Sequence, residues 1–282
     1  MTNILFAHKE TKGFEKQMIY KVINSNIKHF PFPHFETEEF LPKEIISSMK
    51  RDIFHRGPDS SGYYAKRGFS LIFRRLSILD LRKVANQPMI DKENGLSLVF
   101  NGEIYNYLEL KNFLKKKGYK FKTNSDTEVI LNGFKYWGKN ILNKLNGMFA
   151  FTIIDEKKNI AFVARDHFGI KPLYFFKNKN FIFLGSEIRP LKNLINISFD
   201  EKTLGELIFF RYLSGTKTGY KNVYKVDKGQ CLEIDLRTHK IKTSKYFDIL
   251  DTINPVNQIT NINEQVLGLL ENSIIKHTQS DV

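Results

Sequence analysis

The stretch MFAFTIIDEKKNIAFVARDHFGIKPLYFFKNKNFIFL, Met148–Leu184, decides the fold class. It holds four short runs of β-branched and aromatic residues bounded by Gly, Asn, Asp and Lys, which is typical of β-strands. Brief polar turns at 155–159 and 177–180 separate the runs in pairs, so the spacing predicts antiparallel hairpins. The predicted strands are Met148–Ile154, Ile160–Ala164, Pro172–Phe176 and Phe181–Leu184.

Two amphipathic helices are predicted before these hairpins. Asn106–Lys117 carries apolar residues on one face and ends at Gly118, a residue suited to a helix C-terminus. Asp126–Trp137 begins after Ser125, which together with Glu128 predicts a reciprocal capping box.

Further elements extend the pattern on both sides. They are strands at Ser70–Phe73, Leu96–Phe100, Gln230–Asp235 and Lys240–Tyr246, and helices at Pro42–Phe54, after Gly205 and at Glu264–Lys276. Hairpins combined with helices, without regular alternation of strand and helix, predict an α+β fold.

The composition narrows the function classes. A chain of 282 residues can bury one large core, with room for a short second unit. The net charge of +14 comes from dispersed lysines, and no Arg-rich stretch with interleaved aromatics forms a nucleic-acid platform. The longest apolar runs are too short to cross a bilayer, and the first residues lack a secretory pattern. We therefore expect a cytoplasmic protein with no nucleic-acid or membrane partner.

Seven motifs follow one another along the chain. They are HRGPDSSG (His55–Gly62), RRLSILDL (Arg74–Leu81), NGEIYNY (Asn101–Tyr107), SDTEVIL (Ser125–Leu131), NGMFAF (Asn146–Phe151), RDHFGIKPLYF (Arg165–Phe175) and GSEIRPL (Gly185–Leu191). In this order they closely resemble the glutaminase half of asparagine synthetase, a class II glutamine amidotransferase. The resemblance implies an Ntn-hydrolase fold, a four-layer αββα sandwich of two antiparallel sheets.

The same resemblance implies a domain organisation and a set of partners. Residues 1–54 are a divergent N-terminal segment, 55–250 the glutaminase domain, and 264–282 the truncated start of an ATP-dependent synthetase domain. Glutamine is the expected substrate, and a separate synthetase domain or a second copy of the chain is the expected protein partner. The chain needs no cofactor of its own, because ATP and Mg serve only the synthetase domain. No metal ligand set is expected, since the histidines are scattered and Cys231 is the single cysteine.

Hydrolysis of an amide needs a nucleophile, a base and donors for the tetrahedral oxyanion, and the substrate's charged groups must be held. The resemblance assigns the oxyanion donors to Asn101 and Gly102, and the substrate's α-ammonium to Glu103 and Asp126. The residues themselves leave structural alternatives open. Asn-Gly is a common type I′ turn, and an acid in the first turn of a helix complements its dipole.

The resemblance places the α-carboxylate of glutamine on the segment RLSIL. The predicted binding residues there are Arg75, Leu76, Ser77, Ile78 and Leu79. A guanidinium suits this task, because its fork of donors matches a carboxylate. We expect Arg75, Asn101, Gly102 and Asp126 to converge on one pocket.

The nucleophile is the departure from the family pattern. The family uses a cysteine at position 2, exposed once Met1 is removed, and this chain has Thr2 instead. In Ntn enzymes the N-terminal residue supplies the nucleophile and, through its α-amine, the base. A hydroxyl is a weaker nucleophile than a thiol, so little glutaminase activity is expected. Cys231 is expected in the core, and His55 is expected to be structural, because this chemistry needs no second base.

Three interpretations therefore stand. The chain is the glutaminase portion of an asparagine-synthetase-type amidotransferase, which releases ammonia for amidation of an acyl-adenylate. Alternatively, it is a catalytically dead module that keeps the glutamine pocket, or it is a gene fragment with altered ends. In each case the apolar stripe of the last helix is expected to be uncovered, because its partner domain is missing.

Overall fold

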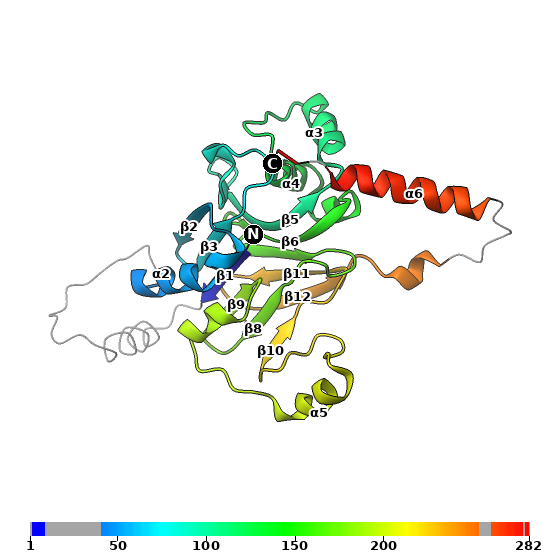
Figure 1. The fold of residues 1–282 in the computed structure, drawn as a ribbon. Helices are drawn as coiled ribbons and strands as arrows, with labels where there is room; N and C mark the ends of the chain where they lie inside the picture. Colours follow the sequence, from blue (N-terminus) through cyan, green and yellow to red (C-terminus); the bar gives the residue numbers. More distant parts are fainter. Residues whose placement is uncertain (1, 9–40, 254–260, 279, 282) are drawn as a thin grey trace.

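The computed structural model describes residues 2–8, 41–253, 261–278 and 280–281. Two six-stranded sheets, each built from antiparallel pairs, form the middle of the molecule, and helices lie on their outer sides (Figure 1). The predicted αββα sandwich is confirmed.

The first sheet has a strand from the chain's N-terminus near its middle. Its spatial order is β10 (Val223–Lys225), β8 (Tyr174–Lys177), β9 (Phe181–Gly185), β1 (Thr2–His8), β3 (Phe69–Arg75) and β2 (Ser60–Lys66). Ile4 of β1 pairs with Ile72 on one side and with Gly185 on the other. The sandwich thus includes a strand from the predicted divergent segment, whose residues 9–40 lie outside the described part of the chain.

The second sheet carries most of the motif residues. Its order is β12 (Ile241–Lys245), β11 (Gln230–Asp235), β7 (Ile160–Arg165), β6 (Gly147–Asp155), β5 (Leu96–Ile104) and β4 (Met89–Asp91). The predicted hairpins β6–β7 and β8–β9 are confirmed, but the two hairpins belong to different sheets.

Side-chain alternation along β6 shows how the layers are held together. Ala150 and Ile154 lie in the core between the two sheets, whereas Phe149 and Phe151 lie in the core between the second sheet and its helices. Successive side chains of a strand point to opposite faces. Both faces are covered here, so all four residues are buried.

Helices complete the two outer layers. α3 (Tyr107–Lys116) and α4 (Asp126–Trp137) cover the second sheet, and α2 (Lys43–Asp52) covers the first. Short 3-10 helices lie at Phe54–Arg56, Lys83–Ala85, Gly138–Asn143, Arg189–Asn193 and Ile249–Thr252. The helix predicted after Gly205 begins earlier: α5 spans Glu201–Phe210, because the Asp200 side chain caps it by accepting from the N–H of Lys202 (3.2 Å).

The last helix, α6 (Ile262–His277), projects from the sandwich (Figure 1). It has no buried residue, and the predicted stripe of Leu267, Leu270 and Ile274 is exposed, as expected. Within the described ranges, no helix combines the length and the apolar character needed to cross a membrane.

Candidate functional site

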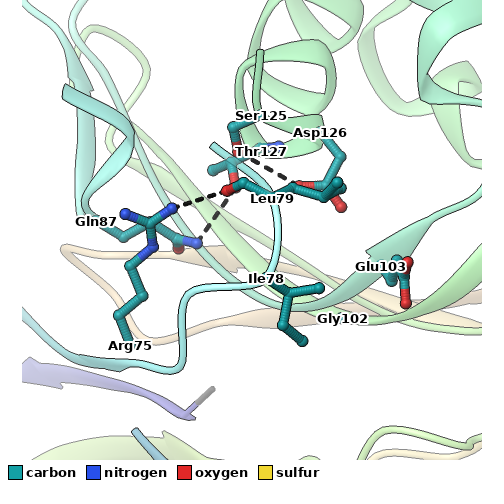
Figure 2. A pocket seen from close by; sticks show the side chains of 9 residues that line it. All are labelled: Arg75, Ile78, Leu79, Gln87, Gly102, Glu103, Ser125, Asp126 and Thr127. Atoms are coloured by element: carbon teal, nitrogen blue, oxygen red, sulfur yellow. Dashed lines mark hydrogen bonds between the residues drawn. The ribbon is translucent and has the colours of Figure 1, made fainter. Parts of the chain in front are cut away.

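A narrow cavity lies where the end of β3, the loop after it, β5 and the start of α4 meet (Figure 2). Its volume of about 10 Å³ holds roughly one water molecule. The lining residues are Arg75, Ile78, Leu79, Gln87, Gly102, Glu103, Ser125, Asp126 and Thr127. The structure therefore brings together most of the predicted site residues.

Arg75 is buried at this cavity, and protein acceptors engage its guanidinium. Nη2 donates to the carbonyls of Leu79 (2.9 Å) and Asp80 (2.7 Å). Nη1 donates to Asn86 Oδ1 (2.8 Å) and to the carbonyl of Arg82 (3.3 Å). The four Nη donors are thus used without a ligand, and Arg75 shapes the cavity through the loop that it holds. Binding of the α-carboxylate of glutamine by Arg75 stays a prediction.

The rest of the RLSIL segment divides between the cavity and the surface. Ile78 and Leu79 line the cavity, whereas Leu76 is 42% exposed and does not line it. Ser77 is also outside the lining, and its N–H donates to Asp59 Oδ2 (2.7 Å) in the HRGPD turn. Arg74, the neighbour of Arg75, lies over the ring of Phe54 at 4.6 Å, on the opposite side of the strand.

Asn101 and Gly102 lie inside β5, so their interpretation as a type I′ turn is wrong. Asn101 is buried, and its side-chain amide donates to Ser186 Oγ (3.3 Å) just beyond β9. Gly102 lines the cavity, and a Cβ there would lie 2.1 Å from the carbonyl oxygen of Met148 in β6. Glycine is therefore required by the neighbouring strand, independently of any ligand.

The position expected for the nucleophile can be placed through its backbone. Thr2 pairs with Arg74, the residue before Arg75, in the β1–β3 ladder. Ile4 pairs with Gly185, and the next residue, Ser186, contacts Asn101. The start of β1 therefore lies at the same end of the sandwich as the cavity, Asn101 and Gly102.

Glu103 and Asp126 bring two carboxyl groups to one cavity. Asp126 is buried, and its Oδ2 accepts from the N–H of Ile104 (3.1 Å). Burial raises the pKa of Asp126 to about 6, and the nearby charge of Glu103 adds to this shift. Burial also raises the pKa of Glu103, while the charges of His277 and Lys171 oppose that rise. A raised carboxyl pKa reports unfavourable negative charge, so the site favours a cationic ligand group.

The start of α4 differs from the predicted capping box. Ser125 Oγ caps the helix by accepting from the N–H of Thr127 (3.1 Å). Glu128 does not reach back to Ser125, because its carboxylate accepts instead from the N–H groups of Lys122 (2.9 Å) and Thr123 (2.7 Å). The carboxylate of Glu128 therefore holds the loop at Lys122 and Thr123, just before α4.

Sequence reasoning missed Gln87. Its amide donates to the carbonyl of Phe100 (3.2 Å) and to Thr127 Oγ1 (3.3 Å), and its Oε1 accepts from the N–H of Phe100 (2.6 Å). Gln87 thereby connects β5 to α4 in the lining of the cavity. A lone glutamine in a loop carries no spacing signal that could have revealed this.

The predicted core position of Cys231 is confirmed, whereas a purely structural role for His55 stays a prediction. His55 Nε2 lies 2.7 Å from Glu187 Oε1, which joins the HRGPD turn to the segment after β9. Cys231 is buried in β11 within the core under the helices, and burial raises the pKa of its thiol.

The sequence is similar to known glutamine amidotransferase domains and asparagine synthetases. A family model for the glutamine amidotransferase domain matches residues 34–247. The chain is 39% identical to asparagine synthetase (glutamine-hydrolyzing) 1 of Bacillus subtilis over 66% of this chain and 30% of that protein. It is 33% identical to a putative asparagine synthetase (glutamine-hydrolyzing) 2 of Methanocaldococcus jannaschii over 85% of this chain and 50% of that protein. The chain thus spans half or less of these relatives.

A solved structure shares the fold. Glutamine phosphoribosylpyrophosphate amidotransferase from B. subtilis superposes with a TM-score of 0.57 and 19% identity, covering 88% of this chain and 49% of that one. An identity this low supports a common architecture and nothing about the ligand.

Proposed function

The chain belongs to the family of glutamine amidotransferase domains, and from this premise we propose that it binds glutamine in the cavity beside Gly102. In this proposal it is the glutaminase portion of an asparagine-synthetase-type protein. The observation that carries the proposal is the pair Glu103 and Asp126, two carboxyl groups at one cavity whose pKa values burial raises. Two such groups favour a cation, and the α-ammonium of glutamine supplies one.

The proposed reaction begins at the start of β1. The hydroxyl oxygen of Thr2 attacks the side-chain amide carbon of glutamine, and the free α-amine of Thr2 takes the hydroxyl proton. The developing oxyanion accepts from the N–H of Gly102 and the amide of Asn101. The proton then passes to the leaving nitrogen, ammonia departs, and water hydrolyses the remaining ester to release glutamate. Met1 must be removed for this to occur.

A second candidate is a module that binds glutamine with little turnover. It is favoured by the hydroxyl at position 2 and by Cys231, the single thiol of the chain, which is buried in β11 away from the cavity lining. In the catalytic version, ammonia passes to an acyl-adenylate made by a synthetase domain. ATP and Mg are used there, and the glutamine step needs no cofactor.

Calorimetric titration of the purified chain tests the binding step. L-Glutamine should bind, whereas 4-carbamoylbutanoate, which keeps the amide and the carboxylate but lacks the α-ammonium, should bind at least about tenfold more weakly. That loss corresponds to one charge-assisted hydrogen bond. Equal affinity for the two ligands would contradict the role given to Glu103 and Asp126.

A further inference from the structure

The C-terminal end of the described chain contacts the wall of the cavity. The backbone N–H of Asp281 donates to the carbonyl of Ile78 (3.0 Å), and Asp281 Oδ2 accepts from the N–H of Asp80 (2.7 Å). Two hydrogen bonds therefore fix the loop that carries Ile78, a lining residue.

A second contact lies just beyond β5, the strand that carries the lining residues Gly102 and Glu103. The ring of His277, the last residue of α6, lies 4.1 Å from the ring of Tyr105, just after β5. The charge of His277 opposes the rise that burial causes in the pKa of Glu103. His277 and Asp281 thus contact the segment after β5 and the loop that carries Ile78.

The loop held by Asp281 is itself under local strain. Asp80 has a φ of 51°, in the left-handed region that residues with a Cβ rarely adopt. Its carbonyl accepts from Arg75, and its carboxylate accepts from the N–H of Asn124 (2.7 Å). A backbone conformation of this kind persists because its surroundings hold it in place.

The small size of the cavity means that contacts which hold its wall also affect ligand binding. A cavity of about 10 Å³ holds roughly one water molecule, and glutamine is many times larger. Binding therefore requires a wall to move. Gly102 and Glu103 of β5 are paired with β6, and α4 is packed in the core, so we take the loop at Ile78 as the wall that moves.

We propose that the contact of Asp281 with Ile78 and Asp80, assisted by His277 on Tyr105, is a latch that keeps the glutamine cavity closed. The inference rests on the proposed function and adds a control over it. α6 has no buried residue, and the last residue of the helix, His277, contacts Tyr105. Release of the latch raises the fraction of molecules with an open cavity, and apparent affinity rises with that fraction.

The test compares three variants of the full chain with the unmodified protein. Asp281→Ala removes the acceptor for the Asp80 N–H, whereas Asp281→Asn keeps a side-chain oxygen that can accept it. Glu271→Ala, at an exposed site on α6, is the matched control. We expect Asp281→Ala to bind glutamine about three- to tenfold more tightly, the effect of losing one hydrogen bond that favours the closed state. The other two variants should bind as the unmodified protein does.

Hydrogen exchange of the Asp80 amide provides a readout that needs no ligand. Exchange should be faster in Asp281→Ala and unchanged in Asp281→Asn, at the same thermal midpoint. Unchanged or weaker glutamine affinity in Asp281→Ala, in a protein that binds glutamine, would overturn the latch and leave the proposed function standing. If every variant failed to bind glutamine, the proposed function would fall, and unchanged exchange at Asp80 would remove the latch as well.

Discussion

Asp126, the first residue of α4, accepts a hydrogen bond from the N–H of Ile104 at 3.1 Å and so joins the helix to β5. Both groups are buried, and the carboxylate lies beside the cavity. The same side chain thus has a structural contact and a charge that burial makes costly. Its two properties can be separated by substitution.

Asp126→Asn should stabilise the fold and weaken glutamine binding. The pKa of Asp126 is about 6 in the folded chain against an ordinary 3.8, so the folded state holds an extra proton between these values. The free energy of unfolding therefore falls as pH rises from about 4 to 6. The amide keeps an acceptor for Ile104, so the variant should gain about 1–3 kcal/mol at pH 7 and nothing at pH 4.

Urea unfolding at the two pH values measures this gain, with Asp251→Asn, an exposed site, as the control. A loss of stability at pH 7 would mean that the charge of Asp126 is compensated in the folded chain. Calorimetry should show weaker glutamine binding by Asp126→Asn at pH 7, because the ammonium loses an ionic partner.

Gly102→Ala should destabilise the chain even in the absence of ligand. The added methyl group would lie 2.1 Å from the carbonyl oxygen of Met148 and 2.7 Å from Cα of Phe149, both of which are backbone atoms of β6. Such overpacking costs about 1–3 kcal/mol or more. Gly205→Ala is the matched control, since Gly205 lies inside α5 and an added Cβ would have no atom within 4 Å apart from its chain neighbours and the backbone of its own helix.

The control should gain up to about 1 kcal/mol, the helix preference of Ala over Gly. Both free energies of unfolding come from urea titration. Similar values for the two variants would show that β5 can shift away from β6, contrary to the packing described.

The sequence predicts local elements better than their assembly. Alternation identifies β6, because Phe149 and Ala150 serve different layers, but no local pattern tells which sheet each hairpin joins. β1 escapes prediction, because Ile4 and Leu5 are both buried in a central strand and give a short apolar run without alternation. Which strands become neighbours in a sheet is decided by tertiary packing and not by the local sequence.

The same limit applies to the site. Arg75, Gly102 and Asp126 are recognisable because they stand in motifs, and they do line one cavity. Gln87 and Asp281 are not, because their partners lie 40 and 201 residues away along the chain. Contacts across such separations depend on the finished fold.

Arg75→Ala should weaken glutamine binding and also reduce stability. The substitution leaves the carbonyls of Leu79 and Asp80 without their buried donor, which costs about 1–3 kcal/mol for an unsatisfied group. Arg75→Lys keeps the charge but cannot span the four acceptors with a single ammonium. Calorimetric titration and urea unfolding of both variants separate the two effects. A lysine variant with unchanged stability would show that the loop does not depend on the guanidinium fork.

Position 2 decides between a catalyst and a binding module. The backbone of Thr2 begins β1 and pairs with Arg74, the residue before Arg75 of the cavity lining. A hydroxyl attacks poorly at neutral pH, so ammonia release from glutamine should be slow or undetectable, and Thr2→Ala should abolish any turnover that exists. Thr2→Cys should raise turnover, because a thiol yields a far better nucleophile while the donors at Asn101 and Gly102 stay in place.

Cys231→Ala is the control for this series, because the thiol is buried in β11 and does not line the cavity. It should change neither binding nor turnover. Ammonia release is measured on purified protein after mass spectrometry has confirmed removal of Met1, since the reaction needs a free α-amine on residue 2. Robust turnover in the unmodified protein that disappears in Thr2→Ala would make it a threonine-dependent amidotransferase. Turnover that survives in Thr2→Ala and is lost in Cys231→Ala would place the active site elsewhere in the fold.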